Sequence, residues 1–131
     1  MKNKNIRAIL IDPFLEKVSE VQTQNDLQGY YNAIGCDTIT ITGLTFGKNN
    51  LDMILDDEGL LKNPDSQRYF KYKLFSQPFA GRALLVSSDR EGNTISVPHD
   101  VYHEHVERDI IWYKPQQNEL EKSLDWTIIP I

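Results

Sequence analysis

One segment of the chain alternates aromatic and basic side chains in a way that suits an anionic ligand. It reads Arg68-Tyr-Phe-Lys-Tyr-Lys-Leu-Phe75 and is called the basic-aromatic segment below. Aromatic rings stack on nucleobases, and neighbouring ammonium or guanidinium groups bind phosphates. We therefore expect a nucleotide-like or other small anionic ligand to bind here. The residues expected to bind it are Arg68, Tyr69, Lys71, Lys73, Phe75 and Arg82.

A structural interpretation of the basic-aromatic segment stays open beside this one. Successive residues of a strand face opposite sides of a sheet, so one set of these side chains can pack on the core. Lysines on the other side are typical of an edge strand, where they discourage pairing with other chains. The alternation by itself does not decide between a ligand site and a protected strand.

The distribution of charge limits the classes of partner. The 131 residues hold 14 Lys and Arg against 19 Asp and Glu, a net charge of −5. Residues 62–82 contain five basic residues and one acid, so this stretch is +4 and the remainder of the chain is −9. A net acidic protein does not coat nucleic acid through bulk charge. The layout favours a small anionic ligand, with a protein–protein inhibitor that uses the acidic surface as the alternative.

A second constellation has the spacing of a metal site. His99 and His103 are four residues apart and Glu107 follows one helical turn later, so on a helix all three share one face. This arrangement would make a metal-dependent hydrolase, the second alternative. Asp100 stands where a zinc-binding helix has the longer glutamate that serves as base, and this face of the expected helix is polar. We expect no metal, no cofactor and no catalytic residue, and the balance favours a protein that is not an enzyme.

The remaining chemically capable side chains have simpler explanations. The single cysteine excludes an internal disulfide, and we expect Cys36 to be a small core residue because no base lies near it in the sequence. Four acids, Asp52, Asp56, Asp57 and Glu58, lie close together, and the last three precede Gly59. An acidic run followed by a glycine predicts a turn.

The elements that must position these residues follow from hydrophobic periodicity. The pattern predicts an α+β fold, a mostly antiparallel β-sheet with two short helices in one compact domain. One helix begins at an Asn25 cap and ends at Gly35, and the other is opened by Ser96 and Pro98 and runs toward Ile110. The expected strands cover residues 6–11, 16–23, 37–42, 51–55, 68–75, 83–86, 94–97 and 110–113.

Two expectations concern the ends of the chain and its location. We expect residues 1–113 to form the domain and residues 114–131 to form a tail whose apolar tip, from Leu124 to Ile131, docks on the domain or on a second subunit, so that a homodimer is plausible. The apolar run at residues 6–11 is short and is interrupted by Arg7, which does not fit a secretory leader. No stretch is long enough to span a membrane, and we expect a cytoplasmic protein.

The order of several short segments resembles a family found largely in phages and mobile elements, domain of unknown function 3846. The resemblance covers roughly residues 6–100, and its segments are turn and strand signatures. They are Ala8-Ile-Leu-Ile-Asp12-Pro13, Ile34-Gly-Cys-Asp37, Asp56-Asp-Glu-Gly-Leu-Leu61, Pro78-Phe-Ala-Gly-Arg-Ala-Leu-Leu-Val86 and Asp89-Arg-Glu-Gly92. The resemblance implies an accessory protein that modulates a host system, such as a defence pathway, in the host cytoplasm. It implies no particular reaction.

Overall fold

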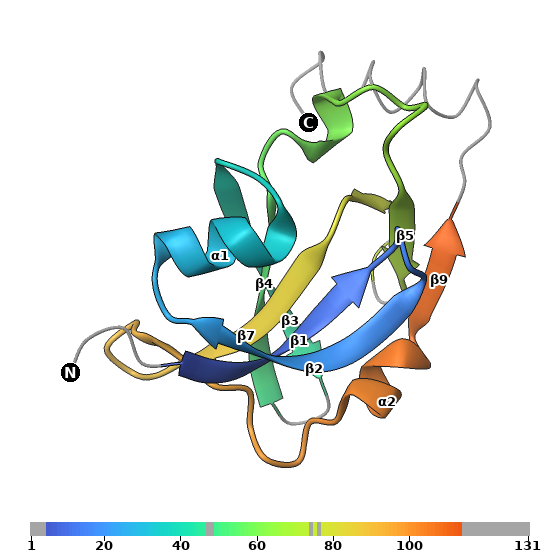
Figure 1. Ribbon diagram of the computed structural model, residues 1–131. Helices are drawn as coiled ribbons and strands as arrows, with labels where there is room; N and C mark the ends of the chain where they lie inside the picture. Colours follow the sequence, from blue (N-terminus) through green and yellow to red (C-terminus); the bar gives the residue numbers. More distant parts are fainter. Residues whose placement is uncertain (1–4, 47–48, 74, 76, 114–131) are drawn as a thin grey trace.

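A computed structural model describes residues 5–46, 49–73, 75 and 77–113 (Figure 1). The expected tail, residues 114–131, lies outside the described residues. The predicted class is confirmed, because the described part is a mostly antiparallel β structure with two short α-helices in one domain. Neither helix of the described part is long and apolar enough to cross a membrane.

The larger sheet has six antiparallel strands in the order β2-β1-β7-β4-β3, with β8 pairing β7. Its strands are β1 (Asn5–Asp12), β2 (Lys17–Gln24), β3 (Ile39–Phe46), β4 (Asn49–Asp56), β7 (Ala83–Ser88) and β8 (Thr94–Ile95). Five of the predicted strands agree with these to within two residues at each end. The strand predicted for residues 37–42 ends too early, because β3 continues through Gly43 and pairs this glycine with Asp52 of β4. The strand expected at residues 94–97 ends earlier, at Ile95.

The smaller sheet has three antiparallel strands in the order β6-β5-β9. They are β5 (Tyr69–Tyr72), β6 (Phe79–Ala80) and β9 (Ile110–Tyr113). The strand predicted for residues 68–75 is therefore shorter than expected. It ends at Tyr72 because the Phe75 N–H donates to the Tyr72 carbonyl at 2.8 Å, which closes a turn.

The two faces of the larger sheet are covered differently. Helix α1 (Leu27–Ile34) packs on one face, where Tyr30 and Ile34 meet side chains from β1, β4 and β7. The smaller sheet and α2 (His103–Glu107) pack on the other face, around the fully buried Phe70 and Tyr72. Period-two alternation explains the division, since Ile9 and Ile11 of β1 point to one side and Ala8 to the other.

Helix α1 is bounded by local signals at both ends. Its N-cap is Asp26, whose carboxylate accepts from the Gly29 N–H at 2.8 Å. The predicted Asn25 cap is wrong by one residue, because the Asn25 amide instead donates to the Thr94 carbonyl at 2.9 Å. Gly35 ends the helix with a φ of 80°, as expected for a left-handed cap.

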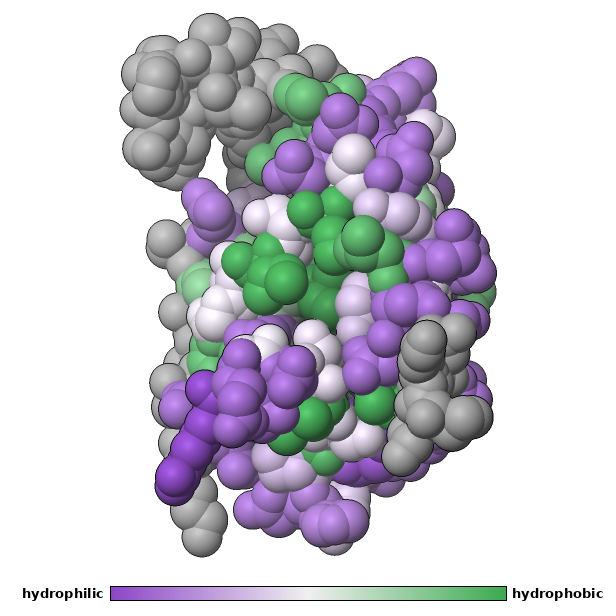
Figure 2. Space-filling view, turned by 90° about the vertical axis from the view of Figure 1, so that its left-hand side faces the viewer, coloured by the Kyte–Doolittle hydropathy of each residue, from purple (hydrophilic) through white to green (hydrophobic). Residues whose placement is uncertain are grey.

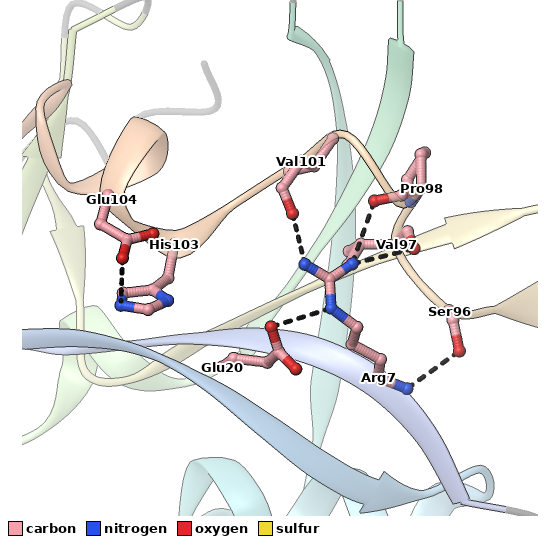
Figure 3. A network of polar contacts seen from close by, with 8 residues as sticks. All are labelled: Arg7, Glu20, Ser96, Val97, Pro98, Val101, His103 and Glu104. Atoms are coloured by element: carbon pink, nitrogen blue, oxygen red, sulfur yellow. Dashed lines mark hydrogen bonds and ion pairs between the residues drawn. The ribbon is translucent and has the colours of Figure 1, made fainter.

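Helix α2 begins later than predicted, and Arg7 supplies the reason (Figure 3). The Arg7 guanidinium donates to the carbonyls of Val97 (3.3 Å), Pro98 (3.0 Å) and Val101 (2.5 Å). Its Nε pairs with Glu20 at 2.9 Å. These contacts hold residues 96–101 outside the helix, with a turn in which the Val101 N–H donates to the Pro98 carbonyl at 3.0 Å, and α2 covers only five residues.

Candidate functional site

The aromatic rings of the basic-aromatic segment belong to the core. Tyr69 is 5% exposed, and Phe70 and Tyr72 are fully buried between the two sheets. Phe75 is half-buried, with its ring centroid 5.1 Å from that of Phe79 in an edge-to-face contact. Buried rings offer a nucleobase little surface for stacking, so Tyr69 in particular is not placed to stack on a ligand.

The basic residues predicted to bind a ligand are not all brought together. Lys71 lies on the smaller sheet, with its Nζ 4.2 Å from the centre of the Tyr113 ring, and Lys73 is exposed just after β5. Arg68 is also exposed, and its Nη1 donates to the Gln67 carbonyl at 2.9 Å. Arg82 lies elsewhere, in the turn that leads into β7. Of the six predicted residues, Arg82 alone lines the hollow described next.

This hollow has a volume of about 110 Å³ and is called the cationic hollow below. Five parts of the chain meet around it: the β1–β2 turn, the end of α1, the end of β4, the loop before β5 and the β6–β7 turn. The lining residues are Phe14, Ile34, Gly35, Asp56, Lys62, Ser66, Gln67, Gly81 and Arg82. Two cations, Lys62 and Arg82, therefore share one small concave surface.

The Arg82 guanidinium is held from three sides. Its Nε pairs with Asp12 Oδ2 at 3.2 Å, and its central carbon lies 4.6 Å from the centre of the Phe14 ring. Its Nη1 lies close to the backbone of Gly35. Within the described part of the chain, neither terminal nitrogen donates a hydrogen bond to a protein acceptor. A fixed fork with unused donors is the geometry that binds carboxylate or phosphate.

Asp12 couples the position of Arg82 to the β1–β2 turn. Its side chain is 9% exposed. Its Oδ1 accepts from the N–H groups of Phe14 and Leu15, at 2.9 and 3.3 Å. One oxygen thus closes the turn that carries Phe14, and the other orients the guanidinium. Because a buried carboxylate without a partner is costly, Asp12 and Arg82 depend on each other.

Lys62 is fixed in a similar way by Asp56. Its Nζ lies 2.9 Å from Asp56 Oδ2. The hydrogen bond that the ammonium donates to this carboxylate raises the pKa of Lys62, so the ammonium stays charged. Asp56 Oδ1 accepts from the Glu58 N–H at 2.9 Å, which confirms the turn expected at residues 56–59. The two carboxylates thereby hold both cations in place and offset part of their charge.

A wider, open hollow of about 500 Å³ adjoins the first and shares Gly35 and Lys62 with it. Its other lining residues are Tyr31, Asn32, Cys36 and Asp37. Cys36 packs on the core as expected but is only half-buried, so it also lines this hollow. Burial, and after it the nearby Asp56 carboxylate, raise the pKa of the Cys36 thiol. The thiol therefore stays protonated at neutral pH and is a weak nucleophile.

The three residues considered for a metal do not all lie on one helix, because only His103 and Glu107 belong to α2. His99 lies in the exposed turn before α2, and His103 is the first residue of that helix. The His103 Nε2 lies 3.5 Å from Glu104, and Figure 3 shows these two side chains pointing toward each other. In the residues that the structure describes, no group of three or more His, Cys, Asp or Glu side chains could hold a metal ion.

The sequence held one signal for the cationic hollow. Four of the five segments that carry the family resemblance supply a residue that lines this hollow or pairs with Arg82, although they are spread over residues 8–86. They contribute Asp12, Gly35, Asp56 and Arg82. Periodicity and spacing gave no sign of this meeting point, because it depends on how the strands are ordered in the larger sheet.

Comparison with known proteins places the chain in a family. Residues 6–109 match the family described as "Domain of unknown function (DUF3846)", and the chain belongs to it. No curated protein and no solved structure matches the chain significantly.

Proposed function

We propose that this member of the DUF3846 family is a non-enzymatic binding protein that holds a small anionic, nucleotide-like ligand in the cationic hollow. In this proposal it serves a phage or mobile element by sequestering that ligand in the host cytoplasm, and so modulates a host system such as a defence pathway. The observation that carries the binding proposal is the Arg82 guanidinium, which Asp12 and Phe14 hold with its terminal donors unused in the described part of the chain.

The size of the two hollows supports a ligand with an anionic head and a larger body. A volume of about 110 Å³ accommodates a phosphate or carboxylate beside Arg82 and Lys62, but not a whole nucleotide. The adjoining open hollow is larger and offers the Tyr31 ring and the Asn32 amide to the rest of the molecule. An aromatic ring and an amide are suited to contacting a base or a sugar.

The protonation states of the lining residues favour binding over catalysis. A nucleophilic cysteine needs a lowered pKa, whereas the pKa of Cys36 is raised. A lysine that acts as a base needs a lowered pKa as well, and the pKa of Lys62 is also raised. Both groups therefore hold their protons near neutral pH. A charged Lys62 attracts an anion but does not abstract a proton from it.

The test is a calorimetric titration with inorganic phosphate and with mono-, di- and cyclic nucleotides, at low and at physiological salt. Binding should weaken as salt rises, because partly exposed charges are screened. Arg82→Lys keeps the charge but removes the fork, and we expect a loss of affinity of about tenfold or more, since a hydrogen bond to a charged group contributes roughly 1.5–3 kcal/mol. Lys62→Ala should also weaken binding.

Lys71→Ala is the matched control, because it removes the same charge from a lysine that does not line the hollow. It should leave the affinity unchanged. If no member of the panel binds even at low salt, or if Lys71→Ala weakens binding as much as Lys62→Ala, the cationic hollow is not the site. The protein–protein inhibitor that uses the acidic surface would then become the leading proposal.

A further inference from the structure

The two outer strands of the larger sheet are protected to different degrees. β2 carries Lys17 and Glu20, and α2 packs against it. β3, at the other edge, reads Ile-Thr-Ile-Thr-Gly-Leu-Thr-Phe and has no charged residue and no proline. Proteins usually place charges, prolines or covering elements at the edges of their sheets to prevent strand addition. β3 has neither charges nor prolines over its eight residues.

The backbone of β3 points unpaired groups outward at alternate residues. The Asp57 N–H donates to the Thr38 carbonyl at 3.3 Å, and these residues lie opposite each other in the continuation of the β3–β4 ladder. Ladder bonds alternate along antiparallel strands, so even-numbered residues of β3 bond to β4. The N–H and carbonyl groups of Ile39, Ile41 and Gly43 therefore face away from the sheet. Within the described residues none of these groups has a hydrogen-bond partner.

The side chains of β3 form a ridge and a gap on the side of the sheet that carries α1. Ile41 lies opposite the buried Ile54 of that side, yet it is 56% exposed. Figure 2 looks onto this side and shows apolar side chains gathered near its middle, among polar ones. Two residues along, a Cβ added to Gly43 would meet no atom within 4 Å. A bulky side chain from outside could lie in that space.

We propose that β3 is a homodimerisation strand that pairs antiparallel with β3 of a second copy. With the two-fold axis at Ile41, Ile41 lies opposite the partner's Ile41, Thr40 opposite the partner's Thr42, and Ile39 opposite the partner's Gly43. The outward backbone groups of both copies then bond to each other, and each Ile39 fills the space beside the other copy's glycine.

A second copy fits this edge better than an unrelated strand does. A two-fold contact must be complementary to itself, and the spacing of Ile39 and Gly43 about Ile41 meets that condition. The absence of charge on β3 matters as well, because each chain carries a net charge of −5 and the copies must approach without opposing carboxylates. The inference concerns a different surface from the cationic hollow and does not depend on the proposed function.

The test is the mass of the full chain in solution, measured by light scattering and sedimentation over a range of concentrations. We expect a concentration-dependent dimer. Ile41→Lys should give a monomer at every concentration, because it places two ammonium groups opposite each other on the two-fold axis. Ile111→Lys is the control, since Ile111 has the same 56% exposure but lies on β9. It should dimerise as the wild type does.

A second variant separates dimerisation from folding. A Cβ at Gly43 meets no atom within 4 Å and valine favours strands, so Gly43→Val should melt no lower than the wild type. It should nevertheless weaken the dimer at least tenfold, because it occupies the space for the partner's Ile39. A wild-type chain that is monomeric throughout overturns the proposal. A dimer that survives both β3 substitutions, or one that Ile111→Lys disrupts equally, also overturns it.

Discussion

The Arg82 guanidinium lies against the backbone of Gly35, where α1 ends. A Cβ added to Gly35 would lie 3.1 Å from Arg82 Nη1, closer than an ordinary van der Waals contact. Gly35 also has a φ of 80°, in the left-handed region that other residues adopt at a cost. One glycine therefore both ends the helix and makes room for the arginine, so the shape of the cationic hollow depends on it.

Gly35→Ala should lower both stability and ligand affinity. The left-handed backbone costs alanine about 1–2 kcal/mol, and the new methyl group displaces the guanidinium as well. Gly92→Ala is the matched control, because Gly92 has a φ of 86° but open space around it. Urea denaturation should show a loss for both variants, whereas calorimetry should show weaker anion binding for Gly35→Ala alone. Equal anion affinity in the two variants would show that Gly35 does not shape the site.

The fold could be predicted from the sequence where local patterns decide it. Short apolar runs located β1, β7 and β9, alternation located the first part of β3, and the glycine after Ile34 located the end of α1. Local patterns could not predict where α2 begins. The start of α2 is set by Arg7, which lies about ninety residues earlier and binds carbonyls of the segment before the helix.

Only part of the candidate site could be predicted from the sequence. Arg82 was among the expected ligand residues and lines the hollow, but Tyr69 is buried, because β5 is the middle strand of a sheet that packs on another. No pattern in the sequence shows that a strand is covered on both sides by distant elements. Phe14, Gly35 and Lys62 were missed for a related reason, since strand order rather than spacing brings them to Arg82.

Removing Arg7 should destabilise the fold by more than an exposed arginine does. Its guanidinium donates to three carbonyls before α2 and pairs with Glu20, and a hydrogen bond to a charged group contributes roughly 1.5–3 kcal/mol. We expect Arg7→Ala to lower the free energy of unfolding by about 2–4 kcal/mol. Arg7→Lys should recover little of this, because one ammonium cannot reach all the acceptors.

Arg90 is the control for this measurement, as an exposed arginine in the turn between β7 and β8. Arg90→Ala should change the free energy of unfolding by no more than about 0.5 kcal/mol. If Arg7→Ala costs as little as Arg90→Ala in urea denaturation, Arg7 does not hold residues 96–101 in place.

The hydroxyl group of Tyr72 does not stabilise the fold through a hydrogen bond to the described residues. The side chain is fully buried, and its oxygen has no hydrogen-bond partner in the described part of the chain. Because an unpaired buried hydroxyl is costly, Tyr72→Phe should leave the free energy of unfolding unchanged or raise it. Tyr72→Ala should lower it by about 3–5 kcal/mol, since it leaves a cavity between the sheets. A Tyr72→Phe variant that is clearly less stable would indicate a partner for the hydroxyl.

Tyr72→Phe should also alter how the free energy of unfolding changes at alkaline pH. Burial, with a smaller effect of Asp109, raises the pKa of Tyr72, so the folded state keeps a proton that the unfolded chain releases near pH 10. The stability from this difference is complete below about pH 10 and is lost as the pH rises further. Denaturation between about pH 9 and 11 should therefore show a shallower decline for Tyr72→Phe than for the wild type. Parallel declines would contradict this.

Cys36 allows the electrostatics beside the cationic hollow to be measured without a ligand. Burial and then the Asp56 carboxylate raise the pKa of its thiol, so little thiolate is present near pH 8. Iodoacetamide reacts with the thiolate, and at that pH it should alkylate the folded chain more slowly than the urea-denatured chain.

Asp56→Asn should speed this reaction in the folded protein. The substitution removes a negative charge that raises the pKa of Cys36. It also releases Lys62, which lies 2.9 Å from the Asp56 carboxylate, so that the ammonium can stabilise the thiolate. Asp57→Asn is the control, because Asp57 is the next residue, is exposed and is not a cause of the shift. Far-ultraviolet circular dichroism would confirm that both variants are folded. If both substitutions speed alkylation equally, the carboxylate of Asp56 does not control the thiol, and its pairing with Lys62 does not set the charge at the edge of the hollow.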